Sequence, residues 1–154
     1  MTEEIFQKFE ISTVKSRLDV AMIHKFLSEE SYWAGGRTLE QTKTAIENSI
    51  CFGVYQIQAG RLRSSHGERQ VGFARVVTDR AAFAYIGDVF ILDEFRGRGL
   101  SKRLMKAMLD HLELQGLRRW ILATRDAHGL YEQFGFSTLK FPERWMELPA
   151  RDAY

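Results

Sequence analysis

The stretch AAFAYIGDVFILDEFRGRGLS, residues 81–101, decides how the rest of the chain is arranged. Its first part, residues 81–92, is almost wholly apolar and is typical of a strand covered by helices on both faces. A glycine-containing loop follows, and then a helix whose first turns carry Lys102, Arg103 and Lys106. A helix N-terminus offers unpaired backbone N–H groups and a positive dipole end. Strand, loop and helix together therefore predict a site for a phosphate-bearing ligand.

Length and composition indicate one globular domain, residues 1–154. Hydrophobic residues make up 45% and charged residues 27% of the chain. The net charge of +2 gives no strong attraction to nucleic acid or to a membrane surface. The lone cysteine, Cys51, lies in the apolar run ICFGVY, and we expect it in the core of a protein from a reducing compartment. The N-terminus lacks the pattern of a signal peptide, so we expect a cytoplasmic protein.

Hydrophobic periodicity predicts an alternation of helices and strands. We expect strands at residues 5–12, 51–57, 70–78, 82–92, 119–124, 136–141 and 145–148. We expect helices at residues 19–31, 38–48, 100–116 and 127–134, the second opened by the capping box Thr38-Leu39-Glu40-Gln41. Residues 58–69 are polar and predict a surface loop.

The connections predict the topology of the sheet. Short turns join the middle strands, which should pair antiparallel, whereas the unit around residues 100–124 should be a right-handed parallel crossover. The predicted fold class is therefore α/β, with a mixed, mostly antiparallel central sheet flanked by helices.

Two familiar glycine-rich phosphate motifs do not fit. A P-loop needs G-x-x-x-x-G-K-[ST], but the chain around Gly99 reads GRGLSK. A dinucleotide fingerprint needs G-x-G-x-x-G, and counted from Gly97 its third glycine falls on Lys102.

A third reading fits. The segment RGRGLS, residues 96–101, resembles the R/Q-x-x-G-x-G/A signature of the GCN5-related N-acetyltransferases. The segment LYEQFGF, residues 130–136, resembles that family's L-Y-E-K-x-G-F segment, and the predicted element order is the family's order. Two positions depart from the pattern, since Ser101 replaces a glycine or alanine and Thr124 stands where members often carry asparagine. The resemblance implies the acyl-CoA N-acyltransferase fold and acetyl-CoA as cosubstrate, with no metal.

The resemblance also implies a cofactor site. The backbone amides of Arg98, Gly99, Leu100 and Ser101 are expected at the pyrophosphate. The backbone of Phe90 and Ile91 is expected along the pantetheine arm, where one N–H would polarise the thioester carbonyl. Candidates for the outer phosphates are Arg96, Lys102, Arg103 and Lys106.

Two residues are expected to move protons. Tyr131 matches the family tyrosine that protonates the departing thiolate. Asp88 is the only ionisable carboxylate in the apolar run 81–92, and a buried charge needs a partner or a purpose. It is a candidate base or an anchor for the amine, and the alternative is an ion pair with an arginine such as Arg75. His128 is the second candidate base.

The acceptor is expected beside the loop SYWAGGR, residues 31–37. Tyr32 and Trp33 are expected to enclose it, with Tyr85 and Phe83 adding to the wall. The alternative is that these aromatic side chains are ordinary core.

Two function classes remain. The first is an N-acetyltransferase that moves an acetyl group from acetyl-CoA to a primary amine of a small or amino-acid-like acceptor, by direct attack in a ternary complex. The second is a non-catalytic acyl-CoA sensor on the same fold. The expected partner is a small-molecule amine, with no nucleic acid and no membrane, and a homodimer is left open. A nucleic-acid interface at Arg61, Arg63 and Arg69 is disfavoured because no aromatic residues interleave them.

Overall fold

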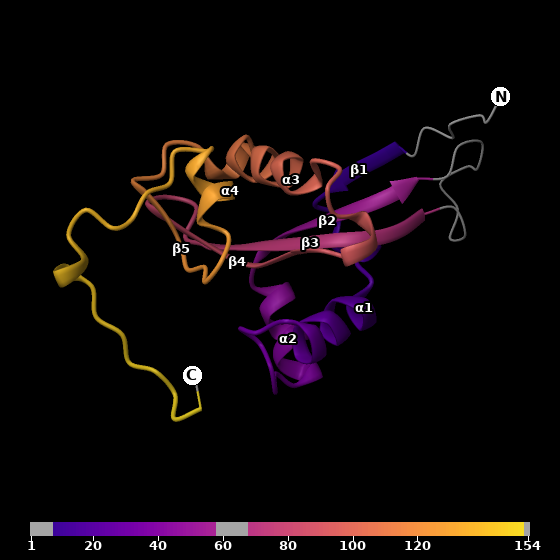
Figure 1. Cartoon of the computed structure of the whole chain (residues 1–154), viewed down its shortest axis with the longest axis horizontal. Helices are drawn as coiled ribbons and strands as arrows, with labels where there is room; N and C mark the ends of the chain where they lie inside the picture. The colour runs from indigo at the N-terminus through magenta and orange to yellow at the C-terminus, as the bar shows by residue number, and fades with distance from the viewer. Residues whose placement is uncertain (1–7, 58–67, 153–154) are drawn as a thin grey trace. The chain divides into compact units, whose positions relative to one another are not determined.

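A five-stranded sheet with strand order β1-β2-β3-β4-β5 forms the centre of the first part of the chain (Figure 1). The computed structural model describes residues 8–57 and 68–152. These fall into two compact units, one ending at Ala123 and one beginning at Thr124. The start of the first expected strand and most of the expected 58–69 loop lie outside the described residues.

The sheet confirms the predicted topology. Its strands are β1 (Lys8–Ser12), β2 (Ile50–Ile57), β3 (Glu68–Thr78), β4 (Phe83–Ile91) and β5 (Arg119–Leu122). The pairs β1–β2, β2–β3 and β3–β4 are antiparallel. β4 and β5 are parallel, as the crossover through α3 (Leu100–Leu109) predicts.

The two N-terminal helices begin within one residue of the predicted positions. Asp19 caps α1 (Val20–Lys25) by accepting a hydrogen bond from the Met22 N–H at 3.0 Å, and the helix continues as a π-helical turn, Phe26–Glu30. α2 (Leu39–Glu47) opens with the complete capping box of Thr38 and Gln41.

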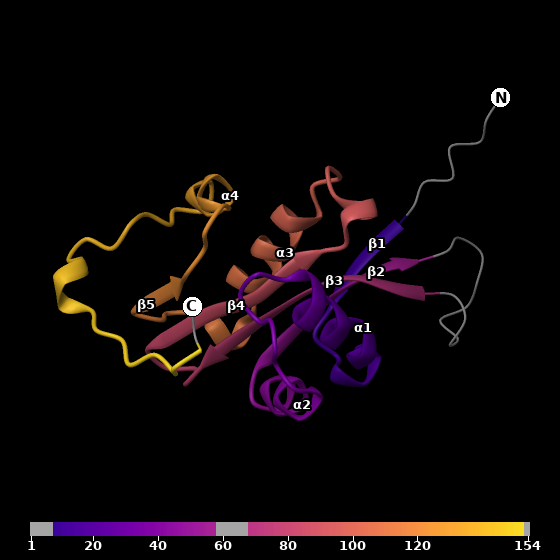
Figure 2. The same ribbon diagram turned by 60° about the horizontal axis from the view of Figure 1, so that its bottom comes forward.

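The helices cover opposite faces of the sheet, α1 and α2 on one and α3 on the other (Figures 1 and 2). On the α1–α2 face, the Phe26 ring stacks on Phe90 with centroids 3.9 Å apart, and Cys51 is buried in the same cluster. Burial raises the pKa of the Cys51 thiol to about 11, so it is a neutral core residue, as predicted. On the other face α3 buries Leu104, Met105 and Met108. Both faces of the sheet are thus used for packing.

Three local expectations are wrong. α3 ends at Leu109 rather than running to Gly116, because the Gln115 side-chain amide donates hydrogen bonds to the carbonyls of Leu109 and His111. Leu112, which the helical pattern placed in the core, is 90% exposed. β4 and β5 are less buried than expected, since residues of β4 alternate between buried and partly exposed positions and no residue of β5 is fully buried.

The second unit holds the short helix α4 (His128–Glu132), followed by Gly135 with a φ of 91°. The strands predicted at 136–141 and 145–148 are wrong: no residue between 124 and 152 is in a strand. Pro142 starts a 3-10 turn, Pro142–Arg144, between the two segments. Alternating side chains fit a strand, but a strand also needs a paired neighbour, and proline removes a donor from any ladder.

Among the helices of the described residues, none has the length and the apolar character needed to cross a bilayer.

One buried polar group stands out in the core of the first unit. The Tyr55 hydroxyl is buried and has no hydrogen-bond partner among the described residues. The side chain lies over Gly53, where a Cβ atom would come within 2.3 Å of the hydroxyl oxygen. The Arg17 guanidinium covers the ring at 4.3 Å from its centroid. Burial raises the pKa of Tyr55 to about 12, so the hydroxyl stays neutral.

We predict that Tyr55→Phe raises the free energy of unfolding by about 1 kcal/mol, because it removes an unsatisfied hydroxyl and keeps the ring. Thermal melting would show a rise of roughly 2–4 °C for a chain of this size. Gly53→Ala is the opposing control and should destabilise, because its Cβ has no room. A clear loss of stability in Tyr55→Phe would contradict the absence of a partner.

Candidate active site

β4 carries a bulge at Asp88. Arg75 pairs with Gly87 and Phe73 pairs with Phe90, so one residue of β3 faces two residues of β4. Asp88 has a φ of 53°, in the left-handed region that few residues other than glycine adopt. Such a conformation costs of the order of 1–3 kcal/mol and persists only where surrounding contacts hold it. The contacts of the carboxylate supply that support.

The Asp88 carboxylate accepts three hydrogen bonds. Its Oδ1 accepts from Trp33 Nε1 at 2.9 Å. Its Oδ2 accepts from Arg37 Nη1 and from Arg75 Nε, each at 2.6 Å. The Asp88 side chain is only 3% exposed. The ion pair with Arg75 considered from the sequence is therefore present, and a second arginine joins it.

These contacts control the charge of Asp88. Burial by itself raises the pKa of this carboxyl, but the hydrogen bond from Arg37 and the charge of Arg75 outweigh burial, and the net pKa is lowered. Asp88 is thus an anion with three of its roughly four acceptor positions used. A carboxylate with a lowered pKa is a weak proton acceptor and a good anchor.

Arg37 was not identified from the sequence. It lies one residue before the capping box, at the end of the α1–α2 loop. Hydrophobic periodicity does not single out a residue in such a loop. Charge could have identified it. A buried aspartate on β4 needs a cationic partner, and the loop expected beside the acceptor, residues 31–37, ends in an arginine.

The aromatic residues of the expected acceptor wall are not ordinary core. Tyr32 and Trp33 are 46% and 40% exposed, and their rings meet edge to face at 5.0 Å. Phe83 is 37% exposed. Tyr85 is half-buried and lies against Gly87, where a Cβ atom would come within 3.1 Å of its ring. The structure therefore brings Trp33 to Asp88 and places Tyr85 beside the same bulge.

The edge of β4 is open beyond the bulge. β5 pairs with β4 only from Phe83 to Ile86. Among the described residues no strand pairs with that edge from Gly87 to Ile91, the part that contains Phe90 and Ile91. The Ile91 carbonyl accepts a hydrogen bond from Arg96 Nε at 3.1 Å, and the edge otherwise has no partner strand among the described residues and can pair with an extended ligand.

The loop that follows β4 leads into an uncapped helix. Gly97 and Gly99 have φ values of 77° and 73°, and no atom lies within 4 Å of the positions that their Cβ atoms would take. No side chain of the described residues caps α3, and its first backbone hydrogen bond runs from the Arg103 N–H to the Gly99 carbonyl. The N–H groups of the first turn therefore keep their capacity to bind an anion.

Comparison with known proteins assigns the family. The model of the acetyltransferase (GNAT) family matches residues 20–136. The chain belongs to the GNAT acetyltransferase family. Its fold is the acyl-CoA N-acyltransferase fold of that family.

Three relatives illustrate the match. A solved structure from Xanthomonas campestris pv. campestris, assigned to the same family (xcc2953), is 47% identical with a TM-score of 0.83 and covers 93% of this chain and 94% of its own. The Gibberella zeae protein named "Putative acetyltransferase FG08082" is 32% identical over 79% of this chain and 74% of its own length. A Clostridium acetobutylicum acetyltransferase solved with acetyl-CoA shares the fold, with a TM-score of 0.64 at 13% identity over 93% of this chain and 96% of its own.

The basic residues around the glycine loop of this GNAT protein differ in what they contact. Arg96 donates to the Ile91 carbonyl at 3.1 Å and pairs with Asp93, so it ties the loop to the end of β4. Arg103 donates to the Phe9 carbonyl, and Lys106 pairs with Asp110. Lys102 is exposed and has no ion pair within the described part of the chain. Lys102 is therefore the cation best available to a phosphate.

The two remaining candidates lie in the second unit of the GNAT domain. Tyr131 on α4 is buried, and its ring meets Phe136 edge-on with centroids 6.1 Å apart. His128 is the first residue of α4 and is exposed. Tyr131 therefore has a fixed local environment, whereas His128 faces solvent.

Proposed function

We propose that this GNAT protein moves an acetyl group from acetyl-CoA to a primary amine of a small or amino-acid-like acceptor, by direct attack in a ternary complex. One observation carries the proposal: the open edge of β4 leads into a glycine loop and an uncapped helix. An extended thioester with a diphosphate at one end suits this arrangement, because its arm can lie along the open edge and its diphosphate at the helix N-terminus.

The cofactor would lie along main-chain groups. The backbone amides of Arg98, Gly99, Leu100 and Ser101 bind the diphosphate, and Lys102 adds a charge near the outer phosphate. The open cradle at Gly97 and Gly99, where no atom lies within 4 Å of a built Cβ, fits such a group. Phe90 and Ile91 pair with the pantetheine arm, and one of their N–H groups polarises the thioester carbonyl.

The acceptor would enter beside the bulge, next to Tyr32, Trp33 and Tyr85. Its nitrogen lone pair attacks the thioester carbon, the C–S bond breaks, and the electron pair leaves with sulfur. Tyr131 gives the thiolate its proton, and the proton lost from the amine goes to water. Holding the amine and thioester at near-attack distance supplies much of the rate.

Asp88 acts in this scheme as a positioning residue. Because its pKa is lowered, it stays charged and keeps Trp33 and both arginines in place. The group of Asp88, Arg37 and Arg75 carries a net positive charge. A neighbouring positive charge disfavours an ammonium ion, so it favours the neutral amine that attacks.

The glycine loop is tested by a matched pair of substitutions. Gly99 and Gly116 have φ values of 73° and 70°, and neither has an atom within 4 Å of a built Cβ. We predict that Gly99→Ala and Gly116→Ala each lose about 1–2 kcal/mol of stability from left-handed strain. Only Gly99→Ala should weaken coenzyme A binding, measured by calorimetry, because only its turn meets the diphosphate. Equal affinities in the two variants would contradict the assignment of this loop.

Tyr131 separates an enzyme from an acyl-CoA sensor. We predict that Tyr131→Phe keeps its affinity for acetyl-CoA and loses about 10²–10⁴-fold in kcat, because the thiolate loses its acid. Release of free thiol with a panel of amines gives the rate, and calorimetry gives the affinity. A wild-type protein that binds acetyl-CoA and acetylates nothing in the panel would favour the sensor.

A further inference from the structure

We propose that the acceptor amine carries an anionic group, a carboxylate or a phosphate, which binds Arg75 in the pocket between α2 and β3. This inference rests on the proposed acetyl transfer and names the class of acceptor. It starts from the charge balance at the bulge.

Within the part of the chain that the structure describes, the ion pairs at the bulge join two positive charges to one negative charge. Arg37 and Arg75 share the single carboxylate of Asp88. Their side chains are only 21% and 15% exposed. A partly buried excess charge is costly unless an anion pairs with it. The net positive charge of this group therefore favours the binding of one more anion.

Arg75 has donors left for that group. Its Nε donates to Asp88, and its Nη1 donates to Ser49 Oγ at 3.2 Å. Its Nη2 lies 3.9 Å from the position that a Cβ of Gly87 would take, on the side of the bulge. A guanidinium offers five N–H donors, so these contacts leave several available for a carboxylate or phosphate.

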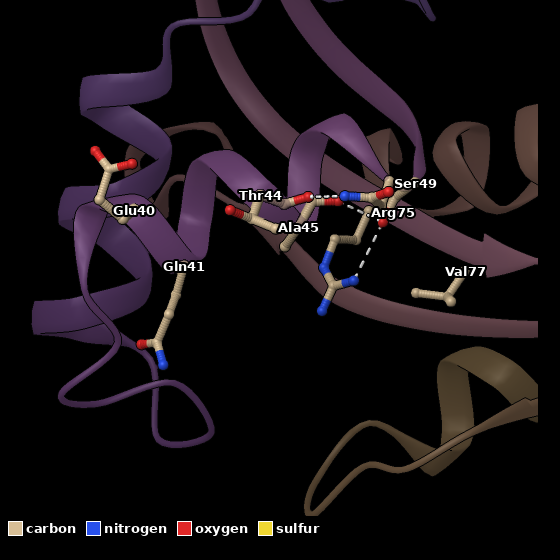
Figure 3. Close-up of a pocket in the computed structure, with 8 residues that line it drawn as sticks. Glu40, Gln41, Thr44, Ala45, Ser49, Arg75 and Val77 are labelled. Atoms are coloured by element: carbon tan, nitrogen blue, oxygen red, sulfur yellow. Dashed lines mark hydrogen bonds between the residues drawn. The ribbon is translucent and has the colours of Figure 1, made fainter.

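Arg75 also lines a pocket. It has a volume of about 470 Å³ and is lined by Thr44, Ala45, Asn48 and Ser49 of the α2 end together with Arg75 and Val77. Figure 3 shows the Arg75 guanidinium below the end of α2, bonded to Ser49. Sites for small molecules have this order of size.

One lining residue is acidic. Glu40 belongs to the pocket wall, but its carboxylate lies 3.6 Å from Lys43 Nζ. Figure 3 shows Glu40 at the other end of α2 from Ser49, with its carboxylate pointing away from Arg75. Among the residues that line the pocket, none therefore brings a second carboxylate to Arg75 beside that of Asp88.

Arg75 also links the pocket to the bulge, because it lines the pocket and its Nη2 lies near Gly87. Arg75 and Tyr85 both flank Gly87, the residue before the bulge, and the open edge of β4 begins there. An acceptor held through its anion at Arg75 would extend past Tyr85 toward Phe90 with its amine. An amino acid or an aminoalkyl phosphate carries an anion and a primary amine in one small molecule, as this placement requires.

The test compares amines that differ only in charge. Amino acids and aminoalkyl phosphates are each assayed with acetyl-CoA beside the matching uncharged amide or alcohol. We expect kcat/KM to favour the anionic member by at least about tenfold. The carboxylate and phosphate arms distinguish the two sources of the anion.

Arg75→Gln should remove this preference, and Arg75→Lys should keep the charge and lose part of the preference because it lacks the planar fork. Arg80→Gln is the control, since Arg80 pairs with Glu113 on the surface, away from the pocket. Circular dichroism checks that the variants fold. If Arg75→Gln does not fold, Arg37→Gln takes its place, because it removes the other arginine that shares Asp88.

A second readout does not need turnover. Anionic amines should raise the melting temperature of the wild type and not that of Arg75→Gln. If uncharged amines are acetylated as well as anionic ones, the inference fails and the acetyl transfer stands. If nothing is acetylated, the proposed function fails. The anion site then stands only if anionic amines raise the melting temperature of the wild type and not that of Arg75→Gln.

Discussion

The carboxylate of Asp88 is the contact on which the rest of the site depends. It sits on a left-handed bulge residue of β4 and accepts hydrogen bonds from Trp33, Arg37 and Arg75. These donors come from the α1–α2 loop and from β3. One buried anion thus joins a strand, its neighbour and the loop above them, and the charge that stabilises the bulge also fixes the aromatic wall.

The bulge divides β4 into two parts with different uses. Before it, Phe83–Ile86 pairs with β5 and completes the sheet. After it, the strand packs Phe90 under α1 and leaves one main-chain edge open, directly before the glycine loop. Arg75 and Tyr85, the side chains proposed to hold the acceptor, both adjoin Gly87, where this open edge begins. In the proposed transfer, each substrate would then approach this point from its own side.

Most of the first unit could be predicted from the sequence, since its signals are local. The capping box of α2, the helical spacing in residues 19–31 and the apolar strands each act within a few residues and agree with the final packing. The errors have non-local causes. The end of α3 is set by a side chain beyond the helix, Gln115, and the alternation at 136–148 has no paired strand to join. Arg37 was missed because its role comes from a carboxylate 51 positions away.

The stability of Asp88→Asn as a function of pH tests this account most directly. Asparagine keeps the shape and the bond from Trp33 but leaves the arginines without an anion, so the loss at neutral pH should be about 3–5 kcal/mol. Because the pKa of folded Asp88 is lowered, its contribution is complete above the usual value of 3.8 and is lost as the pH falls through the lower folded value. Wild type and variant should therefore converge below that pH, while Glu113→Gln, in a surface pair, stays close to wild type throughout. A small difference that does not change with pH would contradict the role given to this anion.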